Sequence, residues 1–132
     1  MLNLKALLLK LVQHYNNVGI YNEWSGTYSL ATGTTLTSVG VNKTIPAGHW
    51  IFFANYRFVS SATGYRSGQI FINDAAMGSS LARKTTSISA LCQLQSTYIC
   101  SSTSSFTVDI RMQQNSGSTQ NVTWRLQAVR IK

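Results

Sequence analysis

Few side chains in this sequence belong to the types that carry out acid–base, metal or nucleophilic chemistry. Among its 132 residues only Glu23, Asp74 and Asp109 are acidic, and they lie far apart along the chain. Carboxylate-pair glycoside hydrolysis and carboxylate-rich Mg²⁺ or Ca²⁺ sites both need more acidic groups than this. The two histidines, His14 and His49, lack the spacing of metal ligands. We therefore predict that the protein is not an enzyme and binds no metal or other cofactor.

The two cysteines, Cys92 and Cys100, leave two interpretations open. Neither lies in a Cys-x-x-Cys motif, which argues against a redox or zinc-binding role. They either form a disulfide between neighbouring segments or remain a reduced, buried pair, because spacing alone does not reveal the geometry that a disulfide requires.

The charge balance is basic, with 11 Lys and Arg residues and a formal net charge of +8. Such a charge suits an anionic partner such as a nucleic acid. The basic residues are dispersed and form no runs with interleaved aromatics, which argues against nucleic-acid binding but leaves it as an alternative. The length suits one folded domain. The dispersed residues are Lys43, Arg57, Arg66, Arg83, Arg111, Arg125 and Arg130.

The elements that must position these residues begin with a leucine-rich segment. Residues 1–18 contain neither Gly nor Pro, and their apolar residues recur in steps of three and four, which predicts a helix. Its apolar seam serves either a coiled coil between chains or packing against its own domain. The run Ala6–Leu9 is too short to cross a bilayer, and Lys10 interrupts any signal-peptide pattern. The seam consists of Met1, Leu4, Leu8, Leu11, Tyr15 and Val18.

After Tyr21 apolar and polar residues alternate with a period of two, which predicts β-strands. The segment 49–60, which follows the turn at Pro46, is apolar on both faces at its start, so we expect a central strand covered on both sides. Several short strands without a second helix predict an antiparallel sandwich or barrel. The expected strands are 24–30, 34–45, 49–60, 68–73, 87–95, 106–113 and 121–132.

The last strand carries apolar residues on both of its faces. Val129 and Ile131 lie opposite Leu126 and Ala128. Either another subunit covers the resulting apolar patch, or the last residues fray from the sheet.

A turn motif resembles a known superfamily. Pro46, Gly48 and Trp50 follow the order proline, any, glycine, any, aromatic. This order is similar to the turn before the aromatic inner strand in trimeric jelly-roll heads of the tumour-necrosis-factor and complement type. The segment Leu126–Ile131 resembles the last strand of small phage and prophage fibre proteins with such heads, which often begin with a leucine-rich helix.

The resemblance implies a mainly β protein: an antiparallel jelly-roll β-sandwich head (residues 21–132) on a short N-terminal α-helix (residues 1–20) that forms a trimeric coiled-coil stalk. Inner aromatic strands of three protomers meet around a threefold axis in such heads, and the two ends of the head lie close together. Residues 95–102 depart from the complement pattern and are expected to form a longer loop. The implied trimer interface is Leu4, Leu8, Leu11, Tyr15, Trp50, Phe52, Tyr56, Trp124 and Leu126.

The resemblance further implies a non-enzymatic, homotrimeric phage or prophage virion protein, either a fibre tip or a surface decoration. It would be made in the bacterial cytoplasm and be extracellular once assembled, in contact with other virion proteins. Its distal loops are expected to bind a glycan or an anionic wall polymer, because aromatic rings stack on sugars and Arg binds phosphate or carboxylate. The alternatives are a purely structural fibre cap and a nucleic-acid-binding protein. The candidate receptor-binding residues are Tyr65, Arg66, Arg83, Lys84, Tyr98 and Asn115.

Overall fold

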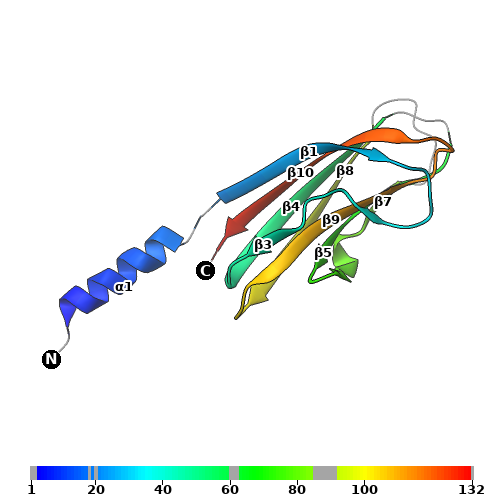
Figure 1. The fold of residues 1–132 in the computed structure, drawn as a ribbon. Helices are drawn as coiled ribbons and strands as arrows, with labels where there is room; N and C mark the ends of the chain where they lie inside the picture. The colour runs from blue at the N-terminus through cyan, green and yellow to red at the C-terminus, as the bar shows by residue number, and fades with distance from the viewer. Residues whose placement is uncertain (1–2, 18, 20, 60–62, 85–91, 132) are drawn as a thin grey trace.

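A computed structural model of the chain contains two antiparallel β-sheets packed face to face, with a helix that projects from one end (Figure 1). In the described residues the strands form two separate sheets, so the sandwich is confirmed over the barrel. The structure describes residues 3–17, 19, 21–59, 63–84 and 92–131.

The first sheet contains four long strands in the order β1-β10-β4-β8. Its central strand β4 pairs with β10 on one side and with β8 on the other. The regular alternation of buried and exposed residues along these strands gives the sheet one core face and one outer face. The strands are β1 (Tyr21–Leu30), β10 (Gln120–Arg130), β4 (Gly48–Phe58) and β8 (Cys92–Ser102).

The second sheet is built on β9 (Phe106–Gln114) and β5 (Arg66–Ile72), which pair with each other. Shorter strands extend it on both sides, two along β9 and two along β5. These are β2 (Thr37–Ser38), β3 (Lys43–Ile45), β6 (Ala75–Ala76) and β7 (Ala82–Lys84), with the 3₁₀ helix η1 (Gly78–Ser80) between β6 and β7.

Aromatic side chains of β4 form the centre of the core between the sheets. Trp50, Phe52 and Tyr56 are at most 1% exposed. Phe52 packs edge-to-face on Phe106, with ring centroids 6.1 Å apart. Gly68 of β5 lies under the Tyr56 ring, where an added Cβ would be only 2.4 Å from a ring carbon. The lack of a side chain at this position therefore lets the second sheet approach the aromatic strand closely.

Two predicted strands differ from the structure. The expected strand 34–45 is divided into β2 and β3, because Gly40 and Asn42 adopt positive φ values of 85° and 22° that an extended strand does not accommodate.

The expected strand 87–95 and the long loop expected at 95–102 are also different. Residues 85–91 lie outside the described residues, and β8 runs without interruption from Cys92 to Ser102 beside β4. The predicted loop is therefore wrong, because these residues continue the ladder along the full length of β4.

The N-terminal segment forms the helix α1 (Leu4–Asn17), which extends away from the sandwich (Figure 1). Asn3 caps it, since its side-chain Oδ1 accepts a hydrogen bond from the backbone N–H of Ala6 at 3.1 Å. Leu4 is 72% exposed and Leu8 and Leu11 are each 61% exposed. In the single chain these three leucines of the seam are therefore not packed against the sandwich. Within the described part of the chain, no helix is long and apolar enough to span a membrane.

The helix joins the sandwich beside the end of the last strand. The backbone N–H of Gly19 donates a hydrogen bond to the carbonyl of Arg130 at 2.7 Å. The N–H of Ile131 in turn donates to the carbonyl of His49 at 2.8 Å. The first and last residues of the head therefore lie at the same end of the sandwich, as the resemblance implied.

Candidate functional site

The outer face of the four-stranded sheet, called the β4 face below, has an apolar half close to α1. The strand register aligns four of its residues in one row across β1, β10, β4 and β8. Ile99 is 63% exposed, Tyr21 52% and Phe53 39%, so this half is an uncovered hydrophobic surface. The apolar half consists of Tyr21, Val129, Ile51 and Ile99, which form the row, and Phe53.

The other half of the β4 face is polar and hollowed. The hollow has a volume of about 560 Å³. Side chains from all four strands contribute to it, and two of them are arginines, Arg57 of β4 and Arg125 of β10. The residues that line it are Ser25, Asn55, Arg57, Gln93, Gln95, Thr123, Trp124 and Arg125.

A carboxylate lies between the two halves. Glu23 accepts hydrogen bonds from the Tyr21 hydroxyl and from Gln127 Nε2, the latter at 2.9 Å. Its other oxygen lies 3.3 Å from Arg125 Nε. The bond from the Tyr21 hydroxyl, followed by that from Gln127, lowers the pKa of Glu23, and the same Tyr21–Glu23 bond raises the pKa of Tyr21. Glu23 is therefore held as an anion by its neighbours.

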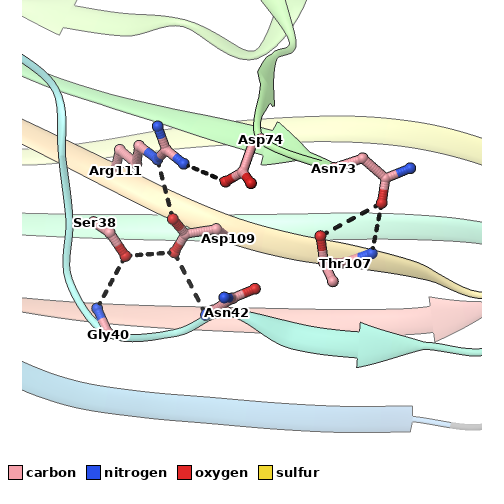
Figure 2. A network of polar contacts seen from close by, with 8 residues as sticks. All are labelled: Ser38, Gly40, Asn42, Asn73, Asp74, Thr107, Asp109 and Arg111. Atoms are coloured by element: carbon pink, nitrogen blue, oxygen red, sulfur yellow. Dashed lines mark hydrogen bonds and ion pairs between the residues drawn. The ribbon is translucent and has the colours of Figure 1, made fainter.

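The outer face of the second sheet, called the β9 face, has a different polar arrangement, shown in Figure 2. Asp109 Oδ1 accepts a hydrogen bond from Ser38 Oγ at 3.0 Å and one from the Asn42 N–H at 3.5 Å. Asp109 Oδ2 lies 3.1 Å from Arg111 Nε, and Arg111 Nη2 lies 2.7 Å from Asp74 Oδ1. The network joins the β2–β3 connection to β9 and to the turn after β5, so it fastens this sheet together.

The same arginine covers an aromatic side chain of the β9 face. The Arg111 guanidinium carbon lies 4.1 Å from the centroid of the Phe71 ring, and Phe71 is only 7% exposed. Nearby, the Oδ1 atom of Asn73 accepts a hydrogen bond from the Thr107 N–H at 2.9 Å (Figure 2). This face is therefore closed by contacts within the chain.

The predicted trimer-interface residues divide into two groups. Leu4, Leu8 and Leu11 are exposed on α1, where another chain can reach them. Tyr15 lies in α1, and its side chain is outside the described residues.

The head residues of that prediction need a correction. Trp50, Phe52, Tyr56 and Leu126 are at most 1% exposed in the single chain and pack between its own sheets, so no second copy can contact them. Trp124 is half-buried and lines the hollow. The surface available to another copy is the opposite side of the same strands, the β4 face.

Four of the predicted receptor-binding residues gather at the end of the sandwich opposite α1. The Arg83 guanidinium carbon lies 4.2 Å from the centroid of the Tyr65 ring. The Asn115 N–H donates to the Tyr65 carbonyl at 3.0 Å. Lys84, next to Arg83 on β7, is exposed.

The other two predicted receptor-binding residues do not lie in exposed loops as expected. Arg66 is fully buried, with Nη1 donating to the Thr63 carbonyl at 2.8 Å, because it occupies an inward position of β5. Tyr98 is not in a loop but on β8, where it packs against the core. Arg66 is therefore out of reach of a receptor, and Tyr98 is only partly exposed.

The structure excludes the disulfide, and the two cysteines do not form a buried pair either, because Cys92 is buried but Cys100 is only half-buried. Cys92 and Cys100 are both free thiols on the single strand β8. Eight residues of strand span about 26 Å at roughly 3.3 Å per residue, far beyond disulfide reach. Burial raises the pKa of both thiols, which makes them less reactive at neutral pH.

The comparisons with known proteins concern structure. No protein-family model matches the sequence, and no curated protein matches it. The globular domain of the zebrafish complement 1qA protein superposes with a TM-score of 0.59 at 8% identity, covering 83% of this chain and 97% of that domain. The chain therefore has a jelly-roll fold.

Two further solved structures are similar at lower scores. A protein of the Bacillus endospore appendages, described as disulfide-linked pili, has a TM-score of 0.48 at 7% identity and covers 87% of this chain and 90% of its own. The tumour-necrosis-factor protein Eiger from S. frugiperda has a TM-score of 0.46 at 10% identity, covering 87% and 94%.

Sequence reasoning missed the β4 face as a site, although part of its signal was present. Val129 and Ile131 were expected to need cover, and Ile131 is 43% exposed in the structure. Ile51 and Phe53 carry the same signal, since they are apolar residues on the side of β4 that faces away from the core.

Proposed function

We propose that this chain is a non-enzymatic subunit of a homotrimeric phage or prophage virion protein, a fibre tip or surface decoration that adheres to a bacterial glycan or anionic wall polymer. The observation that carries the proposal is the placement of two uncovered apolar surfaces. The exposed leucines of α1 and the apolar half of the β4 face both lie at the same end of the head.

We infer that another copy of the chain covers each of these apolar surfaces. A lone helix of 14 residues is marginal in water, and its leucines gain stability only when other helices cover them. Copies that associate side by side along α1 bring their β4 faces together, which covers Phe53 and Ile99 at the same time. The number three comes from the resemblance to trimeric heads.

The opposite end of the sandwich would then point outward and bind the receptor. Tyr65 and Arg83 form a stacked pair there, with Lys84 and Asn115 nearby. An aromatic ring offers a face to a sugar, and the cations attract phosphate or carboxylate groups. The pair therefore suits a glycan or an anionic polymer.

The three acidic residues all have partners within the chain, which supports a binding role over catalysis. Asp74 and Asp109 pair with Arg111, and Glu23 pairs with Arg125 and Tyr21. Asp74 and Asp109 lie on either side of the Arg111 guanidinium group, which neutralises both carboxylates.

The proposal is tested by molar mass and by binding. Light scattering of the full chain is expected to give about three times 14.5 kDa. On a glycan and wall-polymer array, Tyr65→Ala and Arg83→Ala are each expected to weaken binding at least tenfold, while Thr44→Ala on β3 has no effect.

Three outcomes would contradict parts of this proposal. A monomer at micromolar concentration overturns the trimer. A trimer that binds no glycan, polymer or cell surface overturns the adhesive role in favour of a structural cap. Retention on DNA with a steep dependence on salt favours the nucleic-acid alternative.

A further inference from the structure

The β4 face carries more positive than negative charge. In the described part of the chain its charged side chains are Arg57, Arg125 and Glu23. Glu23 lies 3.3 Å from Arg125, whereas the guanidinium group of Arg57 has no hydrogen-bond or ion-pair partner among the described residues. Each copy therefore presents one unbalanced positive charge on this face.

The unbalanced charge lies at the hollow of the polar half. Arg57 pairs in register with Thr123, two residues before Arg125 on β10. Diagonal neighbours of this kind are about 7–8 Å apart, so both guanidinium groups can reach one bound group. The side chains of Asn55 and Gln95 add amide donors from β4 and β8. Donors on three strands thus converge on one space.

Association through the β4 face would enclose this space. Phe53 and Gln127, paired in register, connect the apolar half to the hollow, so a copy that covers one also covers the other. Enclosing a guanidinium group without a counter-charge is strongly unfavourable. Since Glu23 is already engaged by Arg125, the missing negative charge must come from outside the chain.

We propose that the hollow binds a tetrahedral oxyanion, a phosphate or sulfate group, between Arg57 and Arg125, and that association of the copies encloses it. The inference rests on the proposed trimer. A tetrahedral anion presents oxygens in several directions, which suits donors that come from three strands, whereas a carboxylate presents only one planar edge. The anion neutralises the face and allows three basic copies to meet.

The test measures the molar mass and the melting temperature of the full chain while inorganic phosphate or sulfate replaces chloride at constant ionic strength. We expect a trimer whose melting temperature rises with phosphate and then saturates. Arg57→Gln is expected to weaken the apparent phosphate affinity at least tenfold. Arg57→Lys is expected to weaken it by less, because lysine keeps the positive charge but lacks the planar guanidinium group that donates two hydrogen bonds at once. Lys43→Gln, which removes one charge from the other sheet, is expected to change it less than twofold.

A second arm separates free anions from wall-polymer phosphates. Soluble poly(glycerol phosphate) cannot enter an enclosed hollow, so it is expected neither to raise the melting temperature through Arg57 nor to compete with inorganic phosphate. Competition by the polymer would show an open hollow and would overturn the enclosure.

The outcomes also separate this inference from the proposed function. A trimer with the same melting temperature in phosphate, sulfate and chloride overturns the anion site and leaves the trimer standing. A monomer in every buffer overturns both the trimer and the enclosed site.

Discussion

The outer faces of the two sheets both carry a phenylalanine and an arginine, but among the described residues these side chains are covered and paired on one face and exposed and unpaired on the other. On the β9 face Phe71 is 7% exposed beneath Arg111, whereas on the β4 face Phe53 is 39% exposed. Arg111 lies between two carboxylates, whereas Arg57 has no partner within the described residues. The β9 face is covered by contacts within a single chain. The β4 face has exposed apolar side chains and an arginine without a counter-charge in the described part of the chain.

Under the proposed function, this difference makes the β4 face the one that contacts other copies of the chain. In an acid-poor chain with only three carboxylates, two of them are placed on the β9 face to fix one arginine. The β4 face has the third, Glu23, which pairs with Arg125, while Arg57 on the same face has no partner among the described residues. Two of the three carboxylates are therefore paired with one arginine on the β9 face, while the β4 face keeps an unbalanced positive charge among its described residues.

The largest expected effect comes from placing a charge in the apolar half of the β4 face. Phe53→Asp is expected to reduce the molar mass from about three times 14.5 kDa to 14.5 kDa, because association would bury an unpaired carboxylate. The circular dichroism spectrum should keep its β-sheet signal, since Phe53 is not part of the core. Thr44→Asp on the other sheet is the control and should remain trimeric. A trimeric Phe53→Asp would remove this face from the interface.

Truncation of the matching aromatic on the β9 face should act on folding instead of assembly. Phe71→Ala is expected to lower the free energy of unfolding by about 3 kcal/mol, because it removes a nearly buried ring and the surface on which Arg111 rests. Urea denaturation measures the change. An unaltered midpoint would mean that the β9 face does not depend on its covered aromatic.

The ion pairs of Arg111 allow a smaller and graded test. Asp109→Asn is expected to cost about 2 kcal/mol, since Asp109 is 6% exposed and bonds three partners. Asp74→Asn, which changes a carboxylate that is 87% exposed, should cost less than about 1 kcal/mol. Equal losses in the two variants would contradict the assignment of Asp109 as the centre of the network.

The smallest effect concerns Glu23 and the pH dependence of stability. Because the pKa of Glu23 is lowered in the folded chain, its contribution is present above the ordinary value of 4.5 and is lost as pH falls through the folded value. Glu23→Gln is expected to flatten that part of the acid side of the stability curve slightly. An acid limb identical to that of the parent protein would show that the Tyr21–Glu23 contact contributes nothing to stability.

Much of the fold could be predicted from the sequence, but not which side of β4 is the core. Trp50 and Phe52 on one side and Ile51 and Phe53 on the other are equally apolar, so alternation alone leaves the choice open. The deciding signal comes later in the strand. The row that includes Phe52 stays apolar throughout and is buried, whereas the row that includes Phe53 turns polar at Asn55.

The errors among the receptor-binding residues have a similar cause. Arg66 and Ile70 lie an even number of residues apart on β5 and so point to the same, inward side. The strand pattern therefore places a charged residue in the core, although charged residues are seldom buried. The predicted strand ends at Gln95, which places Tyr98 in a loop, whereas β8 continues to Ser102. Contacts between distant segments, such as those of Arg111 with Asp74 and Phe71, have no local pattern that predicts them.

The hydrogen bonds of Gly19 to Arg130 and of Ile131 to His49 have a practical consequence. Both attachment points of the head are at one pole, so a biosensor tether or a display scaffold linked at either terminus would hold the head in the same orientation. The Tyr65–Arg83 end would face the analyte in both cases. Immobilised heads should therefore present the same end of the sandwich to the analyte, whichever terminus is coupled.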